Sequence, residues 1–417
     1  MGTASRRSCV WVAVALASAG AYTPPRRSPR SPRGRGGAGK APQRKREIVV
    51  EPLESWGNFD VGPHRLGAST VSWGDAACGW RPNLKRKKKT SGEIFGTEDV
   101  NKAYQALSEG GVRCWDASAG SEAVELLGRC AEANFQLDPP RVAARCAPSL
   151  RARARALFSG KHTSRYAATS VSKAVDGTLE AFGAAYVDLL LVGPPKPGGS
   201  AAAVRKAAAA AARAGGRVDG VGISNVRGGD NLRAACEALR AAGLRPVACS
   251  IELSLVDNGA LFDGTLAAAK DLDLTVLARA PLHGGLGSGD VTAQNPTGGA
   301  KFGVTPKFRF RALTELAPLH DAINQVASMV EARRADDERK AAQDAGRELK
   351  TRPEKVLPTQ VALNYIAAKG AVPMPAVKTE AHAEVVLGCK GWALTEAEVK
   401  VIDAVLPKSP PKFPRLR

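Results

Sequence analysis

The spacing of hydrophobic and polar positions along this chain alternates between short apolar runs and stretches with helical periodicity. The apolar runs predict eight strands, at His64–Trp73, Arg113–Ala117, Arg141–Arg145, Tyr186–Val192, Val218–Ile223, Pro246–Ser254, Leu274–Ala280 and Ala371–Val377. The helical periodicity predicts helices between them, at Glu98–Gly110, Glu122–Ala133, Ser164–Phe182, Ala201–Ala214, Asn231–Ala242, Leu261–Asp271 and Thr359–Lys369. Eight strands that alternate with helices predict an α/β fold of the (β/α)8 TIM barrel type.

The alternative that this order allows is a doubly wound parallel sheet. A dinucleotide-binding sheet of that kind carries a GxGxxG turn after its first strand, whereas Leu66–Thr70 reads LGAST. We therefore favour a barrel with two charged insertions. Cys78–Phe95 follows the first strand and Ser288–Glu354 follows the seventh, and within the latter Glu331–Lys350 predicts an exposed helix extension. Insertions after barrel strands lie at the C-terminal face, where active sites lie.

The net charge of +20 is concentrated outside most of the predicted barrel. Residues 1–46 contain eleven Lys and Arg side chains and no acidic residue, and Arg81–Lys89 contains six more basic side chains. The remainder of the chain is close to neutral. A nucleic-acid-binding domain needs a basic face or stripe, so we predict no nucleic-acid partner.

The N-terminus has the composition of a targeting segment. Arg6 and Arg7 precede an apolar run from Cys9 to Leu16, and small residues follow, which is the pattern of a signal peptide. Residues 22–46 are rich in Arg, Pro, Ser and Gly and lack acids, so they predict a disordered, transit-like segment. This two-part order resembles the presequences of algae with complex plastids.

We therefore predict a plastid (chloroplast) location, with the secretory pathway as the alternative. The eight cysteines are spaced singly, without CxxC or zinc-type spacing, which favours a reducing compartment and no metal site. The apolar run is too short to span a bilayer, so no membrane insertion of the mature form is expected. The predicted segments are a signal peptide at 1–21, the transit-like segment at 22–46, the barrel at 47–406 and a basic, proline-rich tail at 407–417.

A series of short motifs occurs in a fixed order from Phe59 to Leu406. They are Leu66-Gly67, Trp73-Gly74-Asp75, Trp115-Asp116, Ser121-Glu122, Leu127-Gly128, Val187-Asp188-Leu189, Gly222-Ile223-Ser224-Asn225, Glu252-Leu253-Ser254-Leu255, Pro281-Leu282, Gln360-Val361-Ala362-Leu363-Asn364, Pro373 and Lys378. In this order and spacing the chain resembles the aldo-keto reductase superfamily. The resemblance implies a (β/α)8 barrel that binds NADP(H) in extended form, without a Rossmann motif, and reduces a small-molecule carbonyl.

The resemblance also implies a catalytic tetrad of tyrosine, lysine, aspartate and histidine, and this sequence departs from it at three positions. Asp116 matches the aspartate, but Arg145 stands at the lysine position and Gly193 at the histidine position. The turn from Asp116 to Glu122 is shortened and contains no tyrosine. Arginine keeps the positive charge of lysine but does not titrate near neutral pH. A buried ion pair between Asp116 and Arg145 is the structural alternative to a catalytic role.

Other side chains offer only partial replacements for the missing tetrad. Ser118 has no evident base, Tyr166 is remote, and His162 and His283 lie in loops that are expected at the C-terminal face. For both histidines an ordinary loop position is the favoured interpretation. Losing the general acid together with the orienting group leaves very slow turnover, since such residues act as a unit.

The cofactor positions implied by the resemblance are partly retained. They are Ser224 and Asn225 for the nicotinamide carboxamide, Ser250 in place of a glutamine, Leu282 and Gly284 in a loop for the pyrophosphate, and Lys378 for the 2′-phosphate. Arg279 replaces the aromatic residue that stacks on the nicotinamide. We therefore expect an NADP(H)-dependent oxidoreductase domain with weak or lost carbonyl reduction. The alternative is a non-catalytic barrel, a pseudoenzyme, that senses NADP(H) or binds a protein partner.

Overall fold

The computed structural model describes residue 59, residues 61–62, 64–82, 94–118, 121–146, 164–193, 216–296, 313–346 and 355–407, and positions 204, 208–209 and 211–212. Within 164–193, side chains are described from Val171 onward. The predicted targeting segment, the C-terminal tail and most of the predicted helix Ala201–Ala214 lie outside these residues.

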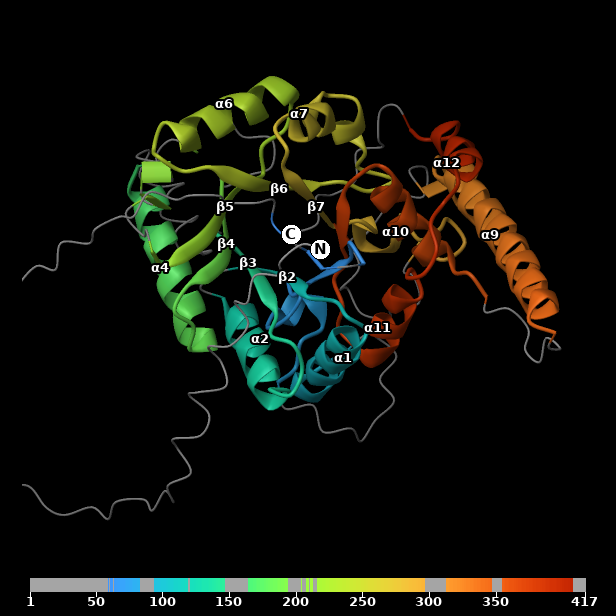
Figure 1. The fold of residues 1–417 in the computed structure, drawn as a ribbon, viewed down its shortest axis with the longest axis horizontal. Helices are drawn as coiled ribbons and strands as arrows, with labels where there is room; N and C mark the ends of the chain where they lie inside the picture. The colour runs from blue at the N-terminus through green and yellow to red at the C-terminus, as the bar shows by residue number, and fades with distance from the viewer. Residues whose placement is uncertain are drawn as a thin grey trace, which may run out of the picture. The chain divides into compact units, whose positions relative to one another are not determined.

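Eight parallel strands form the centre of the fold, as the sequence predicts (Figure 1). They are β1 (Gly67–Ser69), β2 (Cys114–Ser118), β3 (Arg141–Arg145), β4 (Val187–Val192), β5 (Val218–Ser224), β6 (Pro246–Glu252), β7 (Thr275–Arg279) and β8 (Val372–Met374). Each strand pairs with the next one along the chain. The ring closes where the Ser69 backbone N–H donates to the Pro375 carbonyl, 2.8 Å away, and Ser69 bridges to Ala376. The (β/α)8 barrel is thereby confirmed.

Helices surround the strands on the outside of the ring (Figure 1). They are α1 (Thr97–Glu109), α2 (Glu122–Ala133), α4 (Ser164–Phe182), α6 (Gly229–Arg240), α7 (Thr265–Asp271), α9 (Ala317–Asp344), α10 (Pro358–Ala368), α11 (Glu380–Leu387) and α12 (Glu396–Asp403), with short 3-10 turns η1 (Ala76–Cys78), η2 (Gly259–Leu261) and η3 (His283–Gly285). Each of the longer helices turns an apolar stripe inward. In α1, for example, Val100, Ala103, Tyr104 and Leu107 repeat at helical spacing and are fully buried.

The interior of the barrel changes from apolar to charged along its axis. Interior positions alternate along each strand, and those nearer the N-terminal ends belong to an apolar cluster that includes Cys114, Ala143 and Leu277. Two residues further along the same faces, the interior positions are polar. They are Ser69, Asp116, Ser118, Arg145, Ser224, Ser250, Glu252 and Arg279. This polar layer is at the C-terminal ends of the strands, which we call the barrel mouth.

The insertion after β7 contains the longest helix, α9, which packs against α10 and α12. The ring Nε2 of His320 in its first turn lies 2.8 Å from the carbonyl oxygen of Leu286, so α9 contacts the loop that follows β7. The charged side chains of its last two turns are exposed. Among the described helices, none has both the length and the apolar character needed to cross a membrane.

Candidate functional site

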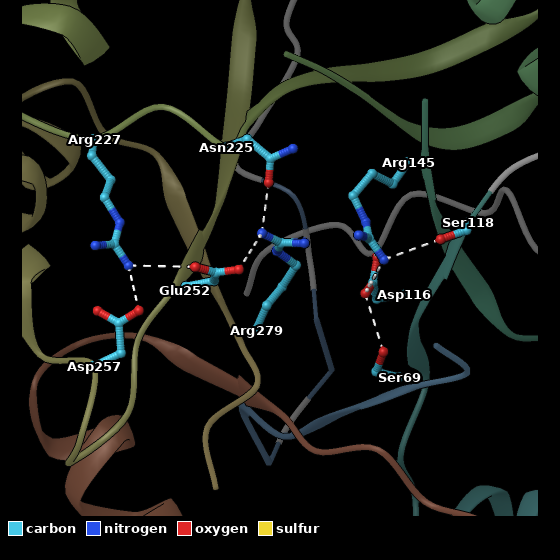
Figure 2. A network of polar contacts seen from close by, with 9 residues as sticks. All are labelled: Ser69, Asp116, Ser118, Arg145, Asn225, Arg227, Glu252, Asp257 and Arg279. Atoms are coloured by element: carbon cyan, nitrogen blue, oxygen red, sulfur yellow. Dashed lines mark hydrogen bonds and ion pairs between the residues drawn. The ribbon is translucent and has the colours of Figure 1, made fainter. Parts of the chain in front are cut away.

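A buried ion pair joins β2 and β3 at the barrel mouth (Figure 2). Arg145 donates from Nε to Asp116 Oδ1 at 3.3 Å and from Nη2 to Asp116 Oδ2 at 3.2 Å. Ser69 donates its hydroxyl to the same Oδ2, and Arg145 Nη2 also contacts the hydroxyl of Ser118 at 3.3 Å. The Asp116 side chain is only 2% exposed. These bonds hold the carboxylate in a fixed, fully partnered position.

The described tyrosines are all placed away from this ion pair. Tyr104 lies in α1, where its ring is 5.1 Å from that of Trp115 and burial raises its pKa to about 12. Tyr365 lies in α10 and donates to Asp403, and burial followed by that carboxylate raises its pKa. Tyr186 is half exposed before β4. A raised pKa opposes proton donation by Tyr104 and Tyr365 near neutral pH. Tyr186 precedes the first residue of β4, at the opposite end of the strand from the mouth.

Gly193 directly follows β4 and packs against the backbone of β5. A Cβ atom at this position would lie 1.8 Å from the carbonyl oxygen of Ser224 and 2.7 Å from its carbonyl carbon. Real Cβ atoms do not approach backbone atoms so closely. The position that matches the histidine of the tetrad therefore excludes any side chain, which is a stronger departure than the sequence alone indicated.

A second group of charged residues occupies the other side of the mouth, on β6, β7 and the loops after β5 and β6 (Figure 2). Arg279 donates from Nη2 to Asn225 Oδ1 at 2.6 Å and lies 3.6 Å from Glu252. Glu252 also pairs with Arg227 at 3.4 Å, and Arg227 pairs with Asp257 at 2.5 Å. Burial, and then the positive charge of Arg145, lower the pKa of Arg279 to about 10. Arg279 therefore keeps its charge at neutral pH.

Two buried hydroxyl groups lie between these charged groups. Ser224 ends β5, Ser250 lies opposite it on β6, and both side chains are almost fully buried. Within the described part of the chain neither hydroxyl oxygen has a hydrogen-bond partner. A buried polar atom without a partner carries a desolvation cost unless a water, an ion or a ligand completes its hydrogen bonds.

The remaining cofactor positions lie around β7 and β8. The chain after β7 turns at Leu282, which packs partly buried on the core, and at exposed Gly284, whose φ is 67°. The backbone N–H groups of Gly285 and Gly287 both donate to the Leu282 carbonyl, so this loop already uses part of its donors internally. Lys378 is half-buried after β8, and its ammonium lies 5.5 Å from the centre of the Phe95 ring.

The structure brings Asp116 and Arg145 together, and it brings Ser224, Asn225 and Ser250 to one side of the mouth. Lys378 and the loop with Leu282 and Gly284 lie on neighbouring strand ends. Of the replacements considered, His283 is subject to the charges of Asp257, Glu252 and Arg227, and burial is the main cause of its lowered pKa. His162 and the side chain of Tyr166 lie outside the described residues. The sequence analysis missed the ion-pair roles of Arg227 and Asp257, because both lie in loops without a motif.

A family model described as the Aldo/keto reductase family matches residues 87–407. This chain belongs to the aldo/keto reductase family. It is 27% identical over 196 residues to the chloroplastic pyridoxal reductase of Arabidopsis thaliana, a match that covers 47% of this chain and 46% of the relative. The chain thus spans about half the length of that curated relative.

Solved structures of other aldo/keto reductases share the barrel. The glycerol dehydrogenase of Gluconobacter oxydans superimposes with a TM-score of 0.54 at 16% identity, covering 88% of this chain and 98% of that one. An aldo-keto reductase of Klebsiella pneumoniae in complex with NADPH gives a TM-score of 0.52 at 14% identity, covering 84% and 95%. At such identities these matches show the fold of this aldo/keto reductase family member.

Proposed function

We propose that this protein is an oxidoreductase-type aldo/keto reductase barrel that binds NADP(H) and has weak or lost carbonyl reduction. The observation that carries the proposal is the closed Asp116–Arg145 pair, in which both carboxylate oxygens accept from the guanidinium. Arginine holds its proton at any physiological pH, so Arg145 supplies charge but no proton. The excluded side chain at Gly193 removes the group that would orient a carbonyl.

The residues fit NADP(H) unevenly. When bound, NADPH supplies a hydride. Lys378 would meet the 2′-phosphate, and the buried hydroxyls of Ser224 and Ser250 would accept or donate at the carboxamide. Asn225, however, accepts from Arg279, so its side-chain oxygen is already used where a carboxamide would need it. We therefore expect the phosphate-bearing half of the nucleotide to contribute most of the affinity.

Calorimetric titration of the purified protein with NADPH and NADP⁺ tests the cofactor proposal. Replacing a charge-assisted phosphate contact in Lys378→Ala should weaken binding by about 10- to 100-fold and abolish any preference for NADPH over NADH. Lys270→Ala, which removes an exposed lysine of α7, should leave the affinity unchanged. Absence of binding at millimolar nucleotide would reject the cofactor role.

Turnover is tested separately, with NADPH consumption followed over a panel of aldehydes and ketones. Loss of a general acid costs about 10²- to 10⁴-fold in rate, so we expect at most trace oxidation of NADPH. The second candidate function, an NADP(H)-sensing or partner-binding barrel without catalysis, is favoured by the packing at Gly193. Binding without turnover supports this second function, and robust turnover rejects it.

We also infer that the protein acts in a plastid. The two-part basic N-terminus supports this location, and the curated relative from Arabidopsis thaliana is a chloroplastic protein.

A further inference from the structure

Two buried guanidinium groups enter the barrel mouth from opposite sides. Arg145 is the last residue of β3 and Arg279 is the last residue of β7, and in a ring ordered β1 to β8 these strands lie four apart, across the barrel from each other. Their side chains are 11% and 13% exposed. Figure 2 shows both side chains at the mouth, with Asp116 beside one and Glu252 beside the other.

The two arginines are compensated unequally. Arg145 has the whole carboxylate of Asp116, whereas Arg279 has an amide oxygen at 2.6 Å and a carboxylate at 3.6 Å. That carboxylate, Glu252, is shared with Arg227 at 3.4 Å. The Nε atom of Arg279 is buried and has no hydrogen-bond partner within the described part of the chain. A buried cation of this kind is stabilised when an anion completes its bonds.

The unpartnered hydroxyls lie on the strands between these arginines. Ser224 and Ser250 are cross-strand neighbours on β5 and β6, and their oxygens are buried. Gly193, the residue directly after β4, adds no side chain next to them. The mouth from β3 to β7 therefore presents two guanidinium groups and two hydroxyl donors, with the Glu252 carboxylate beside Arg279.

We propose that this part of the mouth binds a small monocarboxylate, held between Arg145 and Arg279 and hydrogen-bonded by Ser224 and Ser250. A guanidinium has five N–H donors, and Asp116 occupies only Nε and part of Nη2 of Arg145, so each arginine retains donors for a carboxylate oxygen. A single negative charge is favoured over a dianion because Asp116 and Glu252 flank the arginines and repel additional negative charge. This site is formed by the protein alone. It shares Ser224 and Ser250 with the carboxamide end of the proposed nucleotide site, so carboxylate binding is measured without nucleotide.

The test is a titration of the full chain with acetate and with pyruvate, without nucleotide, at constant ionic strength maintained with chloride. Binding is measured by calorimetry and by the melting temperature. We expect both carboxylates to bind and to raise the melting temperature relative to chloride, and Arg279→Gln to weaken binding about tenfold or more. Arg240→Gln, which removes an exposed arginine of α6, should bind as the original protein does.

Ser250→Ala is a second variant that should weaken carboxylate binding without destabilising the protein. Its hydroxyl has no partner in the protein, so its removal should leave the melting temperature unchanged or higher, while carboxylate binding weakens by several fold. Equal affinities of the original protein, Arg279→Gln and Ser250→Ala would overturn the proposal, as would tighter binding of inorganic phosphate than of acetate. Lys378→Ala separates the two proposals, because it should lose NADPH affinity and keep carboxylate affinity.

Discussion

Directly after β4, Gly193 lies so close to the Ser224 backbone that the packing leaves no room for a histidine side chain at this position. We predict that Gly193→Ala lowers the free energy of unfolding by about 1–3 kcal/mol, the usual range for overpacking, because its Cβ would overlap the Ser224 carbonyl. Gly193→His should be more severe and should not produce carbonyl reduction. Urea unfolding with an NADPH-dependent assay measures both effects.

Gly259→Ala is the matched control for these variants. Its added Cβ would meet only the end of the Arg227 side chain, at 3.8 Å, so the change in unfolding free energy should stay within about 0.5 kcal/mol. A Gly193→His protein that unfolds like the original and reduces carbonyls would show that the strand ends can separate, contrary to this interpretation.

Single residues at strand ends were predictable from the sequence, whereas their partners across the mouth were not. The resemblance placed Asp116 and Arg145 on adjacent strands, and their ion pair was among the alternatives considered. The bond from Arg279 to Asn225 joins residues 54 positions apart, and no local pattern indicates it. Asn225 has a φ of 64°, which asparagine tolerates, and this backbone conformation accompanies the placement of its side chain toward Arg279.

At the scale of the elements, an ion pair between Arg333 and Glu398 joins α9 to α12, and the Glu398 side chain is the buried partner. Arg333 donates to both oxygens of Glu398 at 3.2 Å, and Glu398, 3% exposed, also accepts from the Thr395 backbone in a capping box. Removing the cation in Arg333→Gln leaves that carboxylate without its charged partner. We predict a loss of about 1–3 kcal/mol of unfolding free energy at pH 7, measured by urea unfolding.

The same pair makes a pH-dependent contribution to stability. Burial by itself raises the pKa of Glu398, but the bonds from Arg333 and Thr395, with the charge of Arg333, outweigh it and lower the pKa below 4.5. The contribution is therefore present above pH 4.5 and is lost as the pH falls through the lower folded-state pKa. The difference in unfolding free energy between Arg333→Gln and the original protein should therefore become smaller in that acidic range. Arg339→Gln, in an exposed pair on the same helix, should change stability little at either pH.

Most elements were predictable because strands and helices alternate with a clear change of period. β1 is shorter than predicted, since the backbone turns at Thr70, whose carbonyl accepts from the Trp73 N–H. Of the helix extension predicted at Glu331–Lys350, the part up to Asp344 is the second half of α9, and residues 347–350 lie outside the described residues. The first half of α9 begins at Ala317 and buries apolar residues. The eight-residue helices α11 and α12 were missed, because two turns are too short to show periodicity.

Over the whole molecule, the excess positive charge is concentrated in particular segments of the chain and is not spread evenly along it. Among the described residues of the mouth, three arginines pair with three carboxylates. The excess positive charge of the chain lies mainly in the N-terminal segment and the Arg81–Lys89 run. The positive net charge is thus a property of segments other than the residues of the barrel mouth. This division agrees with a barrel for small molecules rather than for a polyanion.

The N-terminal segment leads to a prediction about the whole protein. Residues 1–46 fused to a fluorescent protein should direct it to the plastid of an alga with a complex plastid, because the apolar run addresses the secretory pathway and the basic stretch then addresses the organelle. Residues 1–21 alone should direct the reporter to the secretory pathway, and residues 22–46 alone should leave it in the cytosol. Microscopy of the three fusions distinguishes these outcomes. Secretion of the 1–46 fusion would support the alternative destination, an oxidising compartment that single, widely spaced cysteines do not favour.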